Sequence, residues 1–153
     1  MVVNRLRDQI HTMLGFEDPP KFLILHVGDN DLGYEKVGHL RNEIKLVLRC
    51  ISRKMPQTKI VWSQILPRFS WRYSDNFEAL KKSRSRLNNC IASCVLKSGG
   101  CYIRYPDLKH PAIFKDDGVH LTELGNELLL NNIQGAIETF NRHLNMSITF
   151  PDH

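Results

Sequence analysis

The sequence predicts a single three-layer α/β/α domain with a parallel sheet. Helical patterns and apolar runs alternate in the order helix–strand–helix–strand–helix–strand–helix, which is typical of linked βαβ units. The run at residues 22–27 is apolar except for His26, as expected of a strand buried on both faces. The 153 residues contain no internal repeat and no linker, so we expect one domain over residues 1–153.

The first half of the chain contains two expected helices and two expected strands. A short amphipathic helix at residues 2–14 ends at Gly15 and is followed by the strand at 22–27. Apolar side chains at helical spacing predict a second helix at 34–54, before Pro56. The next strand, at 59–65, is closed by a proline.

The second half has the same alternation. A helix at residues 76–96 ends before a Gly-Gly pair, and a strand at 101–105 and a loop at 106–121 follow. Thr122 is a suitable N-cap for a final helix at 122–144. The expected buried stripe of the 76–96 helix is Phe77, Leu80, Leu87, Ile91 and Val95. Three strands are few for this architecture, so we expect missing first strands and an open edge that a second copy can pair, as in a homodimer.

Composition indicates an ordinary globular protein. Apolar residues make up 42% and charged residues 24%, and the four cysteines form no CxxC pair. Neither a secretory signal nor an apolar run long enough to span a bilayer is visible, so we expect a cytoplasmic protein. His26, His110 and His120 lack any recognised metal-ligand spacing, and we predict neither a metal nor a cofactor.

Basic residues are concentrated in one part of the chain. The formal net charge is +5, and residues 36–86 carry thirteen Lys or Arg against three acids. Such a region can attract an anionic ligand or nucleic acid, or it can form solvated helix faces. Four aromatic residues lie near Arg68 and Arg72 and can either stack on single-stranded nucleic acid or anchor a loop: Trp62, Phe69, Trp71 and Tyr73.

The first candidate site loop, residues 28–33, follows the first predicted strand. Ligands of parallel α/β sheets bind beyond the carboxyl ends of the strands, which is where this loop lies. Gly28 allows a sharp turn and close approach of a ligand. Asn30 offers a neutral amide donor for a developing oxyanion. The same residue types are also common in turns without any catalytic role.

The second candidate loop contains Asp117 and His120, three residues apart just before the last helix. A turn at this spacing can set the carboxylate against one imidazole nitrogen and leave the other nitrogen free as a general base. A plain Asp-Gly turn with an exposed histidine is the alternative.

Together the two loops resemble a known superfamily. The segment Leu25-His-Val-Gly-Asp-Asn-Asp31 resembles the Gly-x-Asn-Asp block of the SGNH (GDSL-type) hydrolases. Asp117-Gly-Val-His120, followed by Leu-Thr-x-x-Gly, resembles their Asp-x-x-His block. The resemblance covers residues 22–137 and is nearest to platelet-activating factor acetylhydrolase catalytic subunits and retrotransposon-encoded esterase domains. It implies a flavodoxin-like sheet and a serine esterase that acts on a small ester.

The resemblance also implies roles for individual residues. Asp117 would be the orienting acid, His120 the base, Asn30 a side-chain oxyanion donor and Gly28 the residue shaping its turn. The family's Gly-Asp-Ser block is missing, and no serine occurs before Ser52. The nucleophile is therefore unknown: Ser63, Ser70 and Ser74 match no motif, and we interpret them as structural or surface residues. A non-catalytic binding module for a protein or nucleic acid is the alternative function, so whether the chain is an enzyme stays open.

Overall fold

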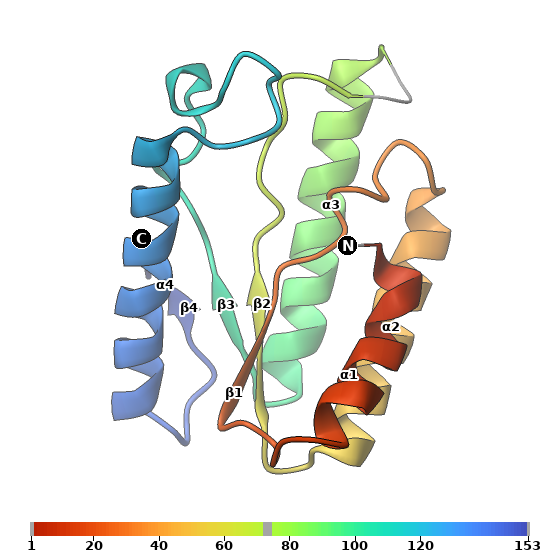
Figure 1. Ribbon diagram of the computed structural model, residues 1–153, viewed down its shortest axis with the longest axis vertical. Coiled ribbons are helices and arrows are strands. Elements are labelled where there is room, and N and C mark those ends of the chain that lie inside the picture. The colour runs from red at the N-terminus through yellow and green to blue at the C-terminus, as the bar shows by residue number, and fades with distance from the viewer. Residues whose placement is uncertain (1, 72–74, 153) are drawn as a thin grey trace.

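The computed structural model describes residues 2–71 and 75–152, and helices cover both faces of its parallel sheet (Figure 1). The predicted three-layer α/β/α architecture is confirmed. The elements in chain order are η1 (Val3–Arg5), α1 (Leu6–Leu14), β1 (Phe22–Leu25), α2 (Val37–Lys54), β2 (Lys59–Ser63), α3 (Phe77–Lys97), β3 (Cys101–Ile103), η2 (Pro111–Ile113), α4 (Glu123–Arg142) and β4 (Thr149–Phe150).

The sheet of the described residues has four parallel strands in the order β1-β2-β3-β4. The expectation of three strands is therefore wrong. The fourth strand is only two residues long, which is too short to produce a recognisable alternation of polar and apolar residues. One edge of β1 carries no partner strand within the described residues, as the sequence leads us to expect.

Successive side chains of the strands point to opposite faces of the sheet and pack into two hydrophobic cores. Leu25 and Trp62 pack with α1, α2 and α3 on one face, whereas Val61 and Ile103 pack with Phe140 of α4 on the other. In Figure 1, α4 stands on one side of the sheet and the other three helices stand on the opposite side. The sheet is thus buried between two helical layers, and its chemistry is confined to the loops at its ends.

The predicted helices and strands are present, with shifted ends. The first three strands stop two residues before the predicted ends, because the chain there turns into loops. Thr122 caps α4 as predicted, since its Oγ1 accepts a hydrogen bond from the Gly125 N–H at 3.2 Å. Phe77, predicted to be buried, is 51% exposed, because it is the first residue of α3.

Asn88 is a buried polar residue on α3 that the helical pattern does not distinguish. Its side chain is 2% exposed and connects α3 to the end of β2. Asn88 Oδ1 accepts hydrogen bonds from the Ile65 N–H at 2.9 Å and from Trp62 Nε1 at 3.3 Å. Its Nδ2 donates to the Ile65 carbonyl at 3.1 Å. The Asn88 side-chain amide therefore hydrogen-bonds to the Ile65 backbone groups, in place of the neighbouring strand that pairs with β2.

The Asn88→Ala variant should unfold more easily than the natural sequence. It leaves the Ile65 N–H and the Trp62 indole N–H without partners and removes a donor to the Ile65 carbonyl, which keeps its hydrogen bond from Arg84, at a cost of about 2–4 kcal/mol in the free energy of unfolding. Urea unfolding monitored by circular dichroism measures this loss. Asn89→Ala, at the exposed neighbouring position, is the control and should change the free energy by less than about 0.5 kcal/mol. Equal effects of the two variants would contradict the role of Asn88.

Candidate active site

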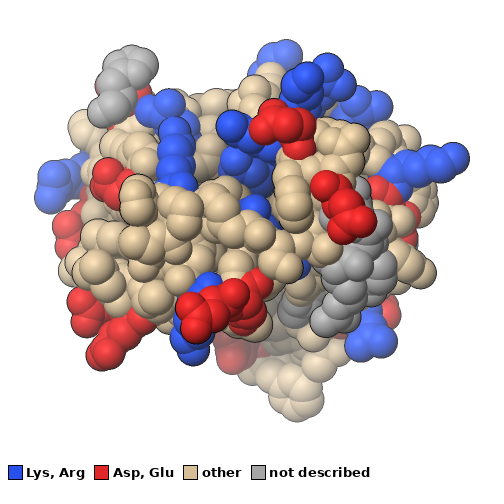
Figure 2. Space-filling model, turned by 90° about the horizontal axis from the view of Figure 1, so that it is seen from above, with Lys and Arg blue, Asp and Glu red and all other residues tan. Residues whose placement is uncertain are grey.

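A hollow of about 1170 Å³ lies at the carboxyl ends of the strands, where the loops after β1 and β2 meet the turn before α4. It brings together Asn30, Asp117 and His120, which the sequence singles out from two loops some ninety residues apart. Arg68, Ser70 and Trp71 also line it, as do Val2 and Arg5 near the N-terminus. Figure 2 looks down on this end of the molecule.

Gly28 shapes the turn that carries Asn30. Its φ of +102° lies in the region that favours glycine, and a Cβ there would lie 3.0 Å from Ile65 Cδ1. The Gly28 carbonyl accepts hydrogen bonds from the N–H groups of Asp31 and Leu32, which closes the turn. The position therefore tolerates no larger residue without strain.

Asp31 ties this turn to the N-terminal segment. Its side chain is buried, and Oδ2 accepts a hydrogen bond from the Val3 N–H at 3.2 Å. Burial raises the pKa of Asp31, and the hydrogen bond from Val3 opposes that change. Its function is therefore to hold the loop, whereas the exposed Asn30 beside it faces the hollow.

Arg68, which belongs to neither of the two sequence blocks, links the two sides of the hollow. Its Nη2 donates to Asp29 Oδ2 at 2.7 Å and to Asn30 Oδ1 at 2.8 Å, while the guanidinium lies 5.5 Å from the centre of the Trp71 ring. An arginine only donates, so Asn30 Oδ1 is engaged and the Asn30 Nδ2 group is left to donate. The sequence signal that marks Arg68 is its place just after the end of β2.

Asp117 and His120 form a hydrogen-bonded pair. His120 Nδ1 lies 2.5 Å from Asp117 Oδ2, and Asp117 Oδ1 accepts from the N–H groups of Val119 and His120 at 2.9 Å. The hydrogen bond from the His120 ring, helped by the two backbone donors, lowers the pKa of Asp117. The carboxylate is thus ionised and accepts only, so Nδ1 carries the proton. Nε2 has no partner within the described residues, and 74% of the His120 side chain is exposed.

The loop after β2 rests directly on the Asp117–His120 turn. Gly118 has a φ of +68°, and a Cβ there would lie 2.9 Å from the Phe69 carbonyl carbon. The Phe69 N–H donates to the Gly118 carbonyl at 2.8 Å, and the Phe69 ring packs edge-on against Phe114. Phe69 therefore anchors the loop, which is one of the two interpretations that the sequence allows.

The other interpretation, a nucleic-acid stacking surface that includes Trp62, is wrong for that residue. Trp62 has no exposed surface and donates its indole N–H to Asn88. Arg72 and Tyr73, also named for this surface, lie outside the described residues. On the face seen in Figure 2, the Lys and Arg side chains of the described residues are interspersed with Asp and Glu side chains.

The candidate serines differ sharply in their surroundings. Ser63 is fully buried, and its Oγ lies 2.8 Å from His26 Nδ1 and 2.5 Å from the Tyr105 hydroxyl. Burial raises the pKa of Tyr105 to about 12, so its hydroxyl stays protonated, and either hydroxyl can be the donor in the hydrogen bond with Ser63. Burial lowers the pKa of His26, and the nearby charge of Asp29 opposes that change. Ser63 is therefore structural, as predicted.

Ser70 has the opposite setting. It is exposed and lines the hollow beside Asp117 and His120. Ser74 lies outside the described residues.

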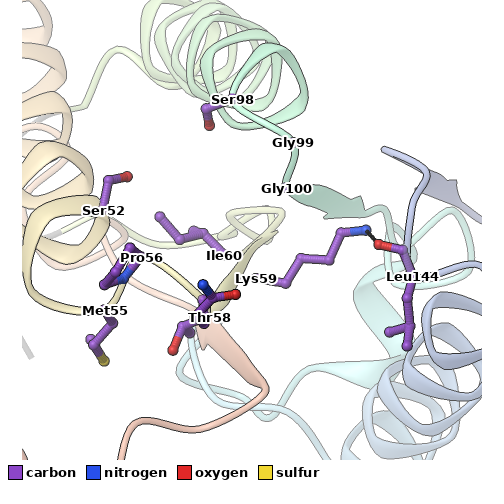
Figure 3. Close-up of a pocket in the computed structure, with 11 residues that line it drawn as sticks. Ser52, Met55, Pro56, Thr58, Lys59, Ile60, Ser98, Gly99, Gly100 and Leu144 are labelled. Atoms are coloured by element: carbon purple, nitrogen blue, oxygen red, sulfur yellow. Dashed lines mark hydrogen bonds between the residues drawn. The ribbon is translucent and has the colours of Figure 1, made fainter.

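A further hollow, of about 320 Å³, lies at the opposite end of the sheet (Figure 3). Thr58, Ile60, Ser98 and Gly100 help to line it, near the amino ends of β2 and β3. Its lysine, Lys59, is occupied, because Nζ donates to the carbonyls of Leu144 at 2.7 Å and Met146 at 2.6 Å. This end of a parallel sheet is not where ligands of such folds bind.

Two sequence expectations concern metals and membranes. Residues 2–71 and 75–152 contain no group of three or more His, Cys, Asp or Glu side chains placed to hold a metal ion. None of the helices that the structure describes is both long and apolar enough to cross a bilayer.

No family model and no curated protein matches the sequence. Solved structures do match it. A Bacteroides fragilis protein, provisionally described as an acylhydrolase, is 19% identical, with a TM-score of 0.70 over 90% of this chain and 68% of that chain. A GDSL-like lipase from Bacteroides thetaiotaomicron is 18% identical, with a TM-score of 0.64 over 90% and 69% of the two chains. The chain has the fold of an SGNH/GDSL hydrolase.

The same fold is found in a fungal enzyme. A carbohydrate esterase of family 3 from Talaromyces cellulolyticus is 15% identical, with a TM-score of 0.65 over 94% of this chain and 69% of that chain. The SGNH resemblance of the two sequence blocks is thus confirmed at the level of the fold. At these identities the likeness does not carry the chemistry of the neighbours over to this chain.

Replacing His120 should change the titration of Asp117. In the folded protein a depressed carboxyl pKa stabilises the fold above the unfolded pKa, and that contribution is lost as pH falls through the folded pKa. His120→Ala removes the largest cause, so the Asp117 pKa should rise towards its ordinary value and the acid-side loss should begin at higher pH. Carboxyl carbon NMR of Asp117 measures the midpoint. An unchanged midpoint would show that the pair is not formed, and His143→Ala, at the exposed end of α4, is the control.

Proposed function

We propose that this chain carries the acid–base and oxyanion elements of a serine-esterase-type site that hydrolyses a small carboxylic ester. Asp117 orients and stabilises the imidazole, His120 is the general base, and Asn30 donates to the oxyanion. The observation that carries the proposal is the Asp117–His120 hydrogen bond in the hollow that Asn30 also lines. The lipase and the carbohydrate esterase of the same fold support it.

The chemistry follows from the protons already placed. As a hydroxyl oxygen attacks the ester carbonyl carbon, its proton passes to His120 Nε2, and the carbonyl oxygen becomes negative. The ionised Asp117 stabilises the resulting imidazolium through Nδ1–H. The Nδ2 group of Asn30, left to donate because Arg68 occupies Oδ1, hydrogen-bonds to the oxyanion. When the tetrahedral intermediate collapses, His120 returns the proton to the departing alkoxide. If the attacking hydroxyl is a serine, the acyl group left on its oxygen is then released by water that His120 activates in the same way.

The attacking hydroxyl is the part of the site without an assigned residue. Ser70 is the serine that lines the hollow within the described residues, so it is the first serine in this chain to test. Water activated by His120 is the alternative nucleophile, and it would give slow hydrolysis without a covalent intermediate.

Labelling with a fluorophosphonate tests the proposal, with peptide mass spectrometry to locate the label. We expect hydrolysis of p-nitrophenyl acetate that falls by about 10²–10⁴-fold in His120→Ala, as is usual for loss of a general base. Asn30→Ala should lower kcat by about 10²-fold or more through the lost oxyanion donor. Labelling of Ser70 that disappears in His120→Ala would identify the nucleophile, whereas hydrolysis without labelling would indicate water.

His143→Ala is the matched control, because His143 is exposed and lies beyond α4. It should leave the rate unchanged. A folded protein that neither hydrolyses the ester nor reacts with the probe would contradict the proposal and favour the non-catalytic binding module.

A further inference from the structure

Another hollow, of about 460 Å³, lies beside the candidate active site and shares Arg68 and Trp71 with it. Its volume is in the range of small-molecule sites. Neither the two sequence blocks nor the Asp117–His120 pair accounts for it. The residues that line it come from the loop after β2, from α3 and from the loop after β3: Pro67, Arg68, Phe69, Trp71, Phe77, Glu78, Lys81, Arg84 and Lys109.

The walls of this hollow are aromatic and open to solvent. Phe77 is 51% exposed and Phe69 is 41% exposed, and the partly buried Trp71 lines both this hollow and the one at the candidate active site. Large apolar side chains that share one exposed hollow indicate a binding surface more often than singly scattered ones do. The wall is also fixed in place, because Phe69 is held by Phe114 and by the Gly118 carbonyl.

The rim of the hollow is cationic. Among the described residues that line the hollow, Lys81, Arg84 and Lys109 are cationic and Glu78 is the one acid, and the guanidinium of Arg68 is already paired with Asp29. Charge complementarity therefore favours an anionic occupant.

Arg84 is the most informative of these cations. It is partly buried, and its Nη1 donates to the Ile65 carbonyl at 3.2 Å. No carboxylate pairs with it within the described residues. Burial lowers the pKa of Arg84 and Tyr102 opposes that change, so desolvation disfavours the cation and no carboxylate of the described residues offsets that cost.

Arg84 also lies between the aromatic hollow and a smaller polar one. Together with Pro67 and Lys109 it lines a smaller polar hollow of about 160 Å³, which Gln64, Asn88 and Tyr105 also border. An occupant can therefore place an apolar body on the aromatic rings and a charged end against Arg84 and Lys109.

We propose that the two adjoining hollows bind an amphipathic carboxylate, with its apolar body against Phe69, Trp71 and Phe77 and its carboxylate at Arg84 and Lys109. The 460 Å³ hollow shares Arg68 and Trp71 with the candidate active site. The amphipathic carboxylate therefore corresponds to the portion of the ester substrate that lies away from the scissile bond. That assignment, though not the binding itself, rests on the proposed esterase function.

Titration calorimetry with decanoate, below its micelle concentration, tests the binding without any need for catalysis. Arg84→Gln and Phe77→Ala should each raise the dissociation constant about tenfold or more, through the lost charge and the lost apolar contact. Arg86→Gln, an exposed residue two positions along the same helix, should change it by less than twofold. Decyltrimethylammonium, which has the same chain and the opposite charge, should bind at least tenfold more weakly than decanoate.

Further variants and probes distinguish failure of this proposal from failure of the esterase proposal. His120→Ala should lower ester hydrolysis by about 10²–10⁴-fold and leave decanoate binding unchanged, so failure of the esterase proposal is distinguishable from failure of this one. If Arg84→Gln does not fold, Lys109→Gln, at an exposed position, replaces it. Decanoate that does not bind, or that binds Arg84→Gln and Phe77→Ala as well as the natural sequence, would overturn the proposal. An oligothymidylate that binds more tightly than decanoate and loses affinity in the same variants would assign the surface to single-stranded nucleic acid instead.

Discussion

The bifurcated contact of Arg68 with Asp29 and Asn30 is the interaction on which the candidate site depends. It joins the loop after β1 to the loop after β2, and 13% of the Arg68 side chain is exposed. Backbone contact with Gly118 then places the Arg68 loop against the Asp117–His120 turn. Three loops far apart in sequence are thus held in one arrangement, which sets the Asn30 amide and the His120 ring around one hollow.

Rigid anchors below the loops make this arrangement possible. Asn88 satisfies the backbone where β2 ends, and Asp31 fastens the turn after β1 to the N-terminal 3-10 helix. Both side chains are buried and hydrogen-bonded, as buried polar groups must be if they are not to destabilise the fold. The exposed residues of the site can therefore keep their positions although they lie on loops.

Much of the fold could be predicted from the sequence, because it rests on local patterns. The apolar run at 22–27, the helical spacing in 34–54 and the cap at Thr122 are properties of neighbouring residues. The two-residue strand β4 could not be predicted, because its pairing with β3 depends on the path of the chain after α4. Phe77 shows a related limit. Helical periodicity identifies the face of α3 that packs on the sheet, but it does not show whether the packed layer extends to the first turn of that helix.

The candidate site likewise contains contacts that the sequence predicts and contacts that it does not. Asp117 and His120 lie three residues apart, so their pairing is a local property that the spacing predicts. Arg68 meets Asn30 across thirty-eight positions, and no sequence pattern encodes that contact. Ser63 illustrates the same limit, since its partners His26 and Tyr105 come from the ends of two neighbouring strands.

NMR of the folded chain with monomethyl methylphosphonate, a tetrahedral anion that stands in for the intermediate of ester hydrolysis, tests whether Asn30 and His120 bind one anion together. We expect the side-chain signals of Asn30 Nδ2 and His120 Nε2 to shift together with one dissociation constant, and Asn30→Ala to weaken binding. Shifts confined to basic residues elsewhere in 36–86, with Asn30 and His120 unmoved, would contradict it.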